Sequence, residues 1–140
     1  GGMADTVKQA EAMIRIRRTH LSAGLLVLCS LSVQAQGWQV PKPSPGLMPN
    51  PVIGKTLFGK VCANCHGANL KGSDKGPPLL HRIYEPAHHA DASFQLAAKN
   101  GVRAHHWQFG DMAPMPQVTS DDVAHITAYV RIEQRKVGIE

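Results

Sequence analysis

The sequence predicts an all-α domain of three to four short helices joined by long loops. Apolar residues recur at helical spacing in three segments, and no segment alternates apolar and polar residues as a half-buried strand does. The stretches between the periodic segments are rich in glycine, proline and histidine. With 140 residues and an apolar fraction of 43%, the chain has room for one small domain.

The first helix is predicted to begin at residue 52 and to run directly into Cys62. Two rows of residues repeat every four positions along it, as expected for neighbouring stripes on one helix face. The rows are Ile53, Leu57 and Val61, and beside them Gly54 and Phe58.

Two further helices are marked by their ends. The segment "DASFQLAAKNG" is expected to begin with Asp91 as N-cap and to stop at Gly101. The segment "TSDDVAHITAYVRIEQRK" opens with Thr119 and has Asp122 three residues later, which is the spacing of a capping box. Its apolar face is predicted to consist of Val123, Ile126, Tyr129 and Val130.

Residues 1–35 are interpreted as an export signal. A basic cluster that ends at Arg18 precedes the apolar run "LSAGLLVLCSLSV", and Ala35 follows where small residues favour cleavage. The run has 13 residues, whereas a membrane span needs about 20, so we expect cleavage and no stable span. An uncleaved membrane anchor is the alternative. Met13 offers a second start, which would make residues 1–12 an artefactual extension. The expected location is the periplasm.

The segment "QGWQVPKPSPGLMPNP", residues 36–51, separates this signal from the domain expected over 52–140. Its five prolines favour an extended linker. The alternative is an arm that lies on the domain and is anchored by apolar side chains. The candidates for such anchors are Trp38, Leu47 and Met48.

Cysteine and histidine spacing carries the functional signal. Of three cysteines, Cys29 falls in the export signal, which leaves Cys62 and Cys65 with His66 in a C-x-x-C-H motif. This spacing is compatible with a covalently held haem, a redox dithiol or half of a zinc site. A dithiol of the thioredoxin type needs a βαβ pattern, which the sequence lacks. Structural zinc needs two more ligands, and the available histidines are His81, His88, His89, His105 and His106.

The haem interpretation accounts for more of the sequence. Two thiols three residues apart add to the two vinyl groups of haem, and the adjacent imidazole then reaches iron. Covalent attachment takes place outside the cytoplasm, in agreement with an export signal. The apolar macrocycle also supplies the core that three short helices are too small to provide.

From residue 52 to residue 137 the chain resembles the class I c-type cytochromes. "GKTLFGKVCANCHG" is similar to the family's N-terminal helix and attachment motif, and "GPPLL" to its G-P-x-L motif. The resemblance implies a small cytochrome c fold around one haem c, bound covalently through Cys62 and Cys65, with His66 as proximal iron ligand. It also implies that the Pro77 carbonyl accepts the N–H of His66 and so fixes its tautomer.

The same resemblance concerns the contact between the first and last helices. It implies that Gly54 and Phe58 pack against the C-terminal helix, where Tyr129 meets Gly54. A glycine lets the two backbones approach closely because it has no Cβ.

The sixth iron ligand is expected from "FGDMAPMPQVTSDDV", which resembles the family's methionine loop. Met112 lies seven residues before Thr119, where the family's ligand usually falls, and is the first choice. Met115 is the second choice because it is followed by proline, as the family's ligand commonly is. Either methionine also suits plain packing.

The other residues near this loop have several interpretations. His105 and His106 would ligate iron in an alternative state, line the haem edge where a partner docks, or be solvated. The pair His88 and His89 has the same range of roles and a weaker signal. Trp107 and Phe109 are expected to wall the haem pocket.

These features predict a single-electron carrier and not an enzyme. Residues 36–140 hold 11 basic and 8 acidic side chains, a net charge of +3, which favours transient docking on acidic surfaces of redox partners. No basic run is dense enough for nucleic-acid binding. Two alternatives stay open: a cytochrome subunit of a fixed oxidoreductase complex, and a five-coordinate haem sensor or peroxidase in which Met112 does not bind iron.

Overall fold

The structure is a computed structural model that describes residues 39–140. The export signal predicted over residues 1–35, with Cys29, lies outside the described residues, as does Trp38. Within the described range the chain forms helices and loops without any extended strand, and Val102 and Met112 make an isolated bridge. The all-α fold class is therefore confirmed.

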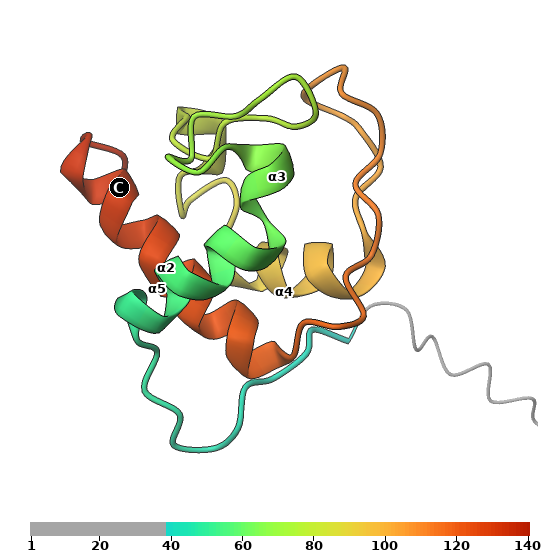
Figure 1. The fold of residues 1–140 in the computed structure, drawn as a ribbon. Coiled ribbons are helices and arrows are strands. Elements are labelled where there is room, and N and C mark those ends of the chain that lie inside the picture. The colour runs from blue at the N-terminus through green and yellow to red at the C-terminus, as the bar shows by residue number, and fades with distance from the viewer. Residues whose placement is uncertain (1–38) are drawn as a thin grey trace, which may run out of the picture. The chain divides into compact units, whose positions relative to one another are not determined.

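The helices follow one another in the order shown in Figure 1. Helix α2 spans Pro51–Val61 and continues after one residue into the short helix α3, Ala63–His66. A 3₁₀ turn, η2, spans Arg82–Tyr84. Helix α4 spans Asp91–Asn100, and the longest helix, α5, spans Ser120–Lys136. None of the helices between residues 39 and 140 is long and apolar enough to cross a membrane.

The ends of α2 and α5 follow from their capping residues. Asn50 caps α2, its side chain accepting hydrogen bonds from the amides of the second and third helical residues, and Pro51 occupies the first position, where no N–H is needed. The helix thus begins one residue before the predicted start. At α5 the predicted capping box is confirmed: Thr119 and Asp122 each accept a hydrogen bond from the other's backbone amide.

The predicted N-cap of α4 was wrong. Ala90 is the N-cap and Asp91 is the first helical residue. The Asp91 carboxylate does not cap its own helix because it accepts a hydrogen bond at 2.8 Å from Nε of Arg131 in α5. A long-range partner has replaced the local one. The predicted end of α4 is confirmed. The last helical residue is Asn100, and Gly101 is the C-cap with a positive φ of 72°.

Helix α2 crosses α5 at Gly54, where the two backbones approach closely. A Cβ placed on Gly54 would lie 1.9 Å from the carbonyl oxygen of His125 and 3.0 Å from Cβ of Tyr129. Beside it Phe58 is buried, with its ring centroid 5.7 Å from that of Tyr129. The contact implied by the resemblance is therefore present. Ile53 is 46% exposed, so the buried stripe of α2 is the glycine and phenylalanine row rather than the row of Ile53.

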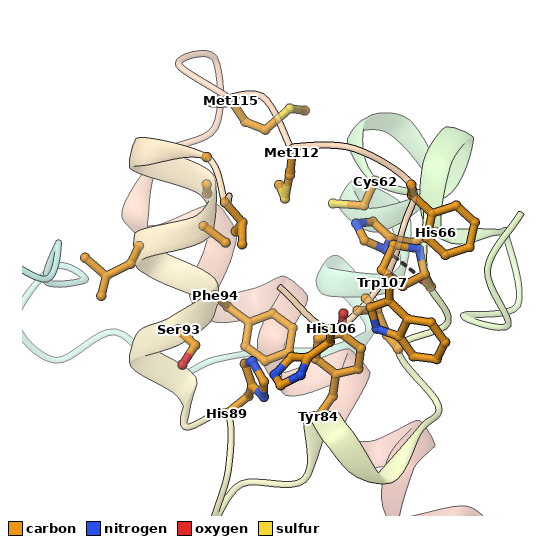
Figure 2. A pocket seen from close by; sticks show the side chains of 18 of the residues that line it. Cys62, His66, Tyr84, His89, Ser93, Phe94, His106, Trp107, Met112 and Met115 are labelled. Atoms are coloured by element: carbon orange, nitrogen blue, oxygen red, sulfur yellow. Dashed lines mark hydrogen bonds between the residues drawn. The ribbon is translucent and has the colours of Figure 1, made fainter. Parts of the chain in front are cut away.

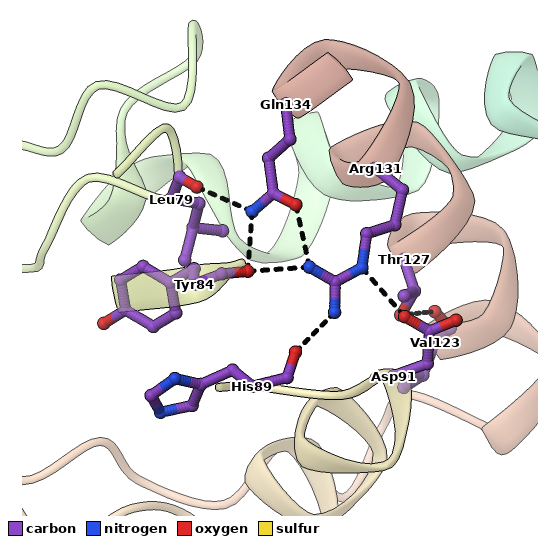
Figure 3. Close-up of polar contacts among 8 residues, drawn as sticks. All are labelled: Leu79, Tyr84, His89, Asp91, Val123, Thr127, Arg131 and Gln134. Atoms are coloured by element: carbon purple, nitrogen blue, oxygen red, sulfur yellow. Dashed lines mark hydrogen bonds and ion pairs between the residues drawn. The ribbon is translucent and has the colours of Figure 1, made fainter. Parts of the chain in front are cut away.

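A buried arginine ties the loop before α4 to α5 (Figure 3). The guanidinium of Arg131 donates to the backbone carbonyls of Tyr84 and His89 and to the side chain of Gln134. Gln134 in turn donates to the carbonyls of Leu79 and Tyr84 at 3.0 and 3.1 Å. These bonds satisfy loop carbonyls that have no secondary-structure partner, so the loop from residue 79 to residue 90 is held in one position.

Residues 39–50, hereafter the arm, lie against the two C-terminal helices. The amide and hydroxyl of Ser44 donate to the Asp121 carboxylate at 2.6 and 2.8 Å. Ser120 donates to the carbonyl of Lys42, and the Asn50 amide donates to His125. Leu47 is half-buried, whereas Met48 is 85% exposed and anchors nothing. Polar contacts therefore hold the arm more than apolar ones.

Candidate haem site

The helices and the loop after α4 surround a cavity of about 540 Å³. This volume lies in the range of small-molecule and cofactor sites. Its walls are mainly apolar, and they come from α2, α4, α5 and both long loops. Side chains that provide these walls include Phe58, Leu79, Phe94, Leu96, Val123 and Ile126. The site can therefore take a large flat apolar group.

His66 contributes one polar group to this cavity. Its Nδ1 lies 2.9 Å from the carbonyl oxygen of Pro77. Because a carbonyl only accepts hydrogen bonds, the ring carries its proton on Nδ1 and leaves the Nε2 lone pair free. Burial lowers the pKa of His66, and the bond to Pro77 opposes this effect in part. The ring is thus a neutral imidazole suited to metal binding. Figure 2 shows it among the side chains that line the cavity.

The two cysteines of the motif differ in environment. Cys62 ends α2 and lines the cavity, whereas Cys65 is exposed. Burial, with a smaller effect of Cys65, raises the pKa of the Cys62 thiol to about 11. The His66 amide donates to the Cys62 carbonyl at 3.0 Å, so one helical turn sets the spacing of thiol and imidazole. Both cysteines are free thiols, available for thioether bonds.

The two candidate methionines differ in how their side chains lie relative to the cavity. The amide and carbonyl of Met112 each bond to Val102, at 2.8 and 2.9 Å, and its sulfur points into the cavity in Figure 2. The amide of Met115 bonds to the Ala98 carbonyl, and its side chain lies along the rim, with its sulfur 4.0 Å from the side-chain amide of Gln117. Both residues line the cavity, but Met112 presents its thioether more directly.

Polar and aromatic side chains gather where Tyr84 and Trp107 line the cavity (Figure 2). Trp107 Nε1 is buried and has no hydrogen-bond partner among the described residues. The indole lies close enough to Tyr84 to oppose the rise that burial causes in the pKa of that phenol. An unpaired buried donor is costly, and a carboxylate such as a haem propionate would satisfy it. The cavity therefore fits haem at its polar end as well as along its apolar walls.

The alternatives for the motif find little support here. The described residues contain no strand on which a thioredoxin-like dithiol would sit. They contain one histidine cluster with metal-ligand spacing, His88, His89 and His106, and neither cysteine belongs to it. Trp107 and Phe109 both line the cavity, as expected. Sequence reasoning did not find Phe94 or Tyr84 as wall residues, because no motif contains them.

A family comparison decides among these interpretations. The model of the cytochrome c family matches residues 52–132. The chain belongs to the cytochrome c family. A cytochrome c domain holds haem c with its iron, attached through thioether bonds, and Cys62 and Cys65 are the thiols of this domain's motif.

Relatives of this cytochrome c are named as cytochrome c subunits of a bc1 complex in two Mycobacterium species. The chain is 36% identical over 81 residues to the "Cytochrome bc1 complex cytochrome c subunit" of Mycobacterium bovis and to that of Mycobacterium tuberculosis. The match covers 52% of this chain and 29% of each relative. This chain therefore matches less than a third of the length of these relatives. No solved structure gave a significant match.

Proposed function

We propose that this cytochrome c carries single electrons between redox proteins, with His66 and Met112 as the two axial ligands of its haem iron. The haem supplies a one-electron Fe(III)/Fe(II) couple when bound. The observation that carries the proposal is that the His66 ring and the Met112 sulfur face the same apolar cavity. If both residues held the iron, no coordination position would remain for oxygen or peroxide, and the haem would supply electron transfer alone.

The residues around the iron tune the couple. The hydrogen bond to Pro77 holds the His66 imidazole in the ligating tautomer and raises its basicity. The Met112 thioether is a soft ligand that favours Fe(II), and the apolar walls disfavour the extra charge of Fe(III). Both effects raise the reduction potential relative to a haem with two histidine ligands.

The setting of this activity is part of the same proposal. The basic, apolar and small-residue pattern of residues 1–35 supports export to the periplasm. The net charge of +3 over residues 36–140 supports weak, transient docking on acidic surfaces of a reductase and an oxidase.

Carbon monoxide tests the carrier proposal because it binds ferrous haem only at an open or labile position. The chain is expressed with a cytochrome c maturation system, and the reduced absorption spectrum is recorded before and after CO is added. We expect no change in the native protein and a shifted Soret band in Met112→Ala. Met115→Ala is the matched control, and its reduced spectrum should not change when CO is added.

Each other outcome selects an alternative. A native protein that binds CO supports a five-coordinate sensor or peroxidase and contradicts the carrier proposal. If the Met115→Ala variant binds CO and the Met112→Ala variant does not, the sixth ligand is Met115.

The relatives favour a second candidate, a cytochrome subunit of a fixed oxidoreductase complex. Both are named as bc1 complex subunits, although the match covers 29% of their length. Size-exclusion chromatography of a native extract, followed by haem absorbance, separates the two candidates. A free shuttle elutes near the mass of the mature chain, whereas a subunit elutes with its complex.

A further inference from the structure

Four histidines from two separate loops meet at the edge of the haem cavity, and three of them, His89, His105 and His106, line it. His88 and His89 precede α4, and His105 and His106 lie in the loop that follows it. The ring centroid of His106 lies 5.1 Å from that of His88, 5.3 Å from that of His89 and 4.2 Å from that of His105. One ligand nitrogen from each of His88, His89 and His106 lies within 4.8 Å of the others.

Two of these rings have the hydrogen bond that prepares an imidazole for a metal. Nδ1 of His89 lies 2.5 Å from the Ile83 carbonyl, and Nδ1 of His105 lies 2.8 Å from the Arg103 carbonyl. A carbonyl only accepts, so each ring carries its proton on Nδ1 and has a free lone pair on Nε2. Metal-binding histidines almost always donate their other N–H in this way. His66 has the same arrangement toward the iron.

Both loops are held in place independently of any metal. The His88 and His89 amides donate to the Glu85 carbonyl at 3.0 and 2.8 Å, and Arg131 donates to the His89 carbonyl. Across the cluster, the Ala104 amide donates to the Asp111 carboxylate at 2.8 Å. The ligand nitrogens are therefore brought together by backbone contacts rather than by attraction between the rings.

We propose that His88, His89 and His106 form a second metal site, separate from the haem iron, that binds one divalent transition-metal ion. Imidazole nitrogens suit zinc, copper and nickel, and three of them with one water form a common zinc environment, so zinc is the expected occupant. His105 stands next to His106 as a source of a fourth nitrogen. Neither Cys62 nor Cys65 takes part, which distinguishes this site from a structural zinc site on the C-x-x-C motif.

The test is zinc titration of the holoprotein, purified without a polyhistidine tag, by isothermal titration calorimetry near pH 7.5. We expect one zinc ion per native chain. His88→Ala and His106→Ala should each weaken binding at least tenfold, on the order of the loss caused by disturbing a metal site. His88 is exposed and does not line the haem cavity, so His88→Ala should leave the fold and the haem spectrum unchanged.

His125→Asn is the matched control. His125 accepts a hydrogen bond from the Asn50 amide away from the cluster, and asparagine keeps an acceptor at that distance from the backbone. Zinc affinity should equal that of the native protein. Failure of the native protein to take up zinc, or equal affinity in the native protein and both alanine variants, would overturn the proposal.

A second measurement needs no variant. The oxidised native holoprotein receives one equivalent of Cu²⁺, and pulsed electron paramagnetic resonance of the copper signal reports the remote nitrogens of coordinated imidazoles. Several equivalent imidazoles are expected. A copper signal without imidazole modulation would contradict the site even if an alanine variant failed to fold.

Discussion

At the scale of single residues, the same arrangement recurs in the chain: a histidine whose Nδ1 is hydrogen-bonded to a backbone carbonyl. His66 meets Pro77, and His89 meets Ile83, each time leaving one lone pair free. Surroundings then separate the two roles. Both residues line the same cavity, but the His89 ring has the imidazoles of His88 and His106 as close neighbours. The same tautomer suits both the proposed iron ligand and the proposed ligand of a second metal.

Gly101 is the residue on which the position of Met112 depends. Its φ of 72° and ψ of −176° fall in a region used almost only by glycine, and a Cβ there would lie 2.3 Å from the Met112 carbonyl. Gly101→Ala should therefore destabilise the holoprotein by roughly 1–3 kcal/mol and displace Met112, the proposed sixth ligand. Chemical denaturation measures the first effect, and CO binding to the reduced protein measures the second.

Gly110→Ala is the matched control for this loop. Gly110 also has a positive φ, 85°, but a Cβ there meets nothing within 4 Å. It should lose some stability through backbone strain and still exclude CO. If both variants stay closed to CO, Gly101 does not position the sixth ligand.

The residues of the haem attachment motif could be predicted because they are close together in the sequence. Cys62, Cys65 and His66 share one helical turn, so their spacing alone indicates their chemistry. The histidine cluster could not be predicted in this way. His88 and His106 are separated by the whole of α4, and only the fold brings their rings together.

At the scale of elements, the crossing of α2 and α5 depends on a single missing Cβ. Gly54→Ala would place a carbon 1.9 Å from the His125 carbonyl oxygen, a backbone atom that cannot rotate away. The helices would have to separate, at a cost of about 3 kcal/mol, the upper end of typical overpacking penalties. Urea denaturation of the holoprotein followed by circular dichroism measures the change.

The same helix offers an internal control. Gly59 is exposed, and a Cβ there meets nothing within 4 Å. Gly59→Ala should stabilise the protein by about 0.5–1 kcal/mol, because alanine has a higher helix propensity than glycine. Equal effects of the two substitutions would show that the close approach at Gly54 is unimportant for stability.

Helix starts could be predicted where the cap is local and not where a distant partner intervenes. The Thr119 capping box is complete within four residues, and its prediction is confirmed. Asp91 was predicted as an N-cap from its residue type alone, but its carboxylate binds Arg131, 40 residues away. The short helix α3 and the turn η2 escaped prediction because neither is long enough to show an apolar period.

At the scale of the whole molecule, the haem occupies space that the helices cannot fill themselves. Helices arranged around an apolar cavity of about 540 Å³ bury little surface against one another, so the protein core alone gains little free energy on folding. A Cys62→Ala, Cys65→Ala double variant isolated without haem should therefore show no cooperative thermal transition. A sharp transition in that haem-free variant would mean that the protein core is sufficient on its own.

The arm shows what long-range polar contacts add to this fold. The pattern of prolines predicted an extended segment, but not its partner, because Ser44 and Asp121 lie 77 residues apart. Donation by the amide of Ser44, and then by its hydroxyl, lowers the pKa of Asp121 below the ordinary value of 3.8. A carboxylate with a lowered pKa stabilises the docked arm fully above its unfolded pKa. This contribution is lost as the pH falls through the folded pKa.

The Asp121 titration therefore reports whether the arm is docked. Nuclear magnetic resonance of the reduced holoprotein can follow the Asp121 carboxyl signal from neutral pH downward. Ser44→Ala removes the hydroxyl donor while the backbone donor stays, so the midpoint should move up toward 3.8 without reaching it. Ser120→Ala is the control, because it removes the contact of α5 with the Lys42 carbonyl and leaves both donors to Asp121. If Ser44→Ala leaves the midpoint unchanged while Ser120→Ala shifts it, the arm is held through Ser120, and the Asp121 carboxylate is not its anchor.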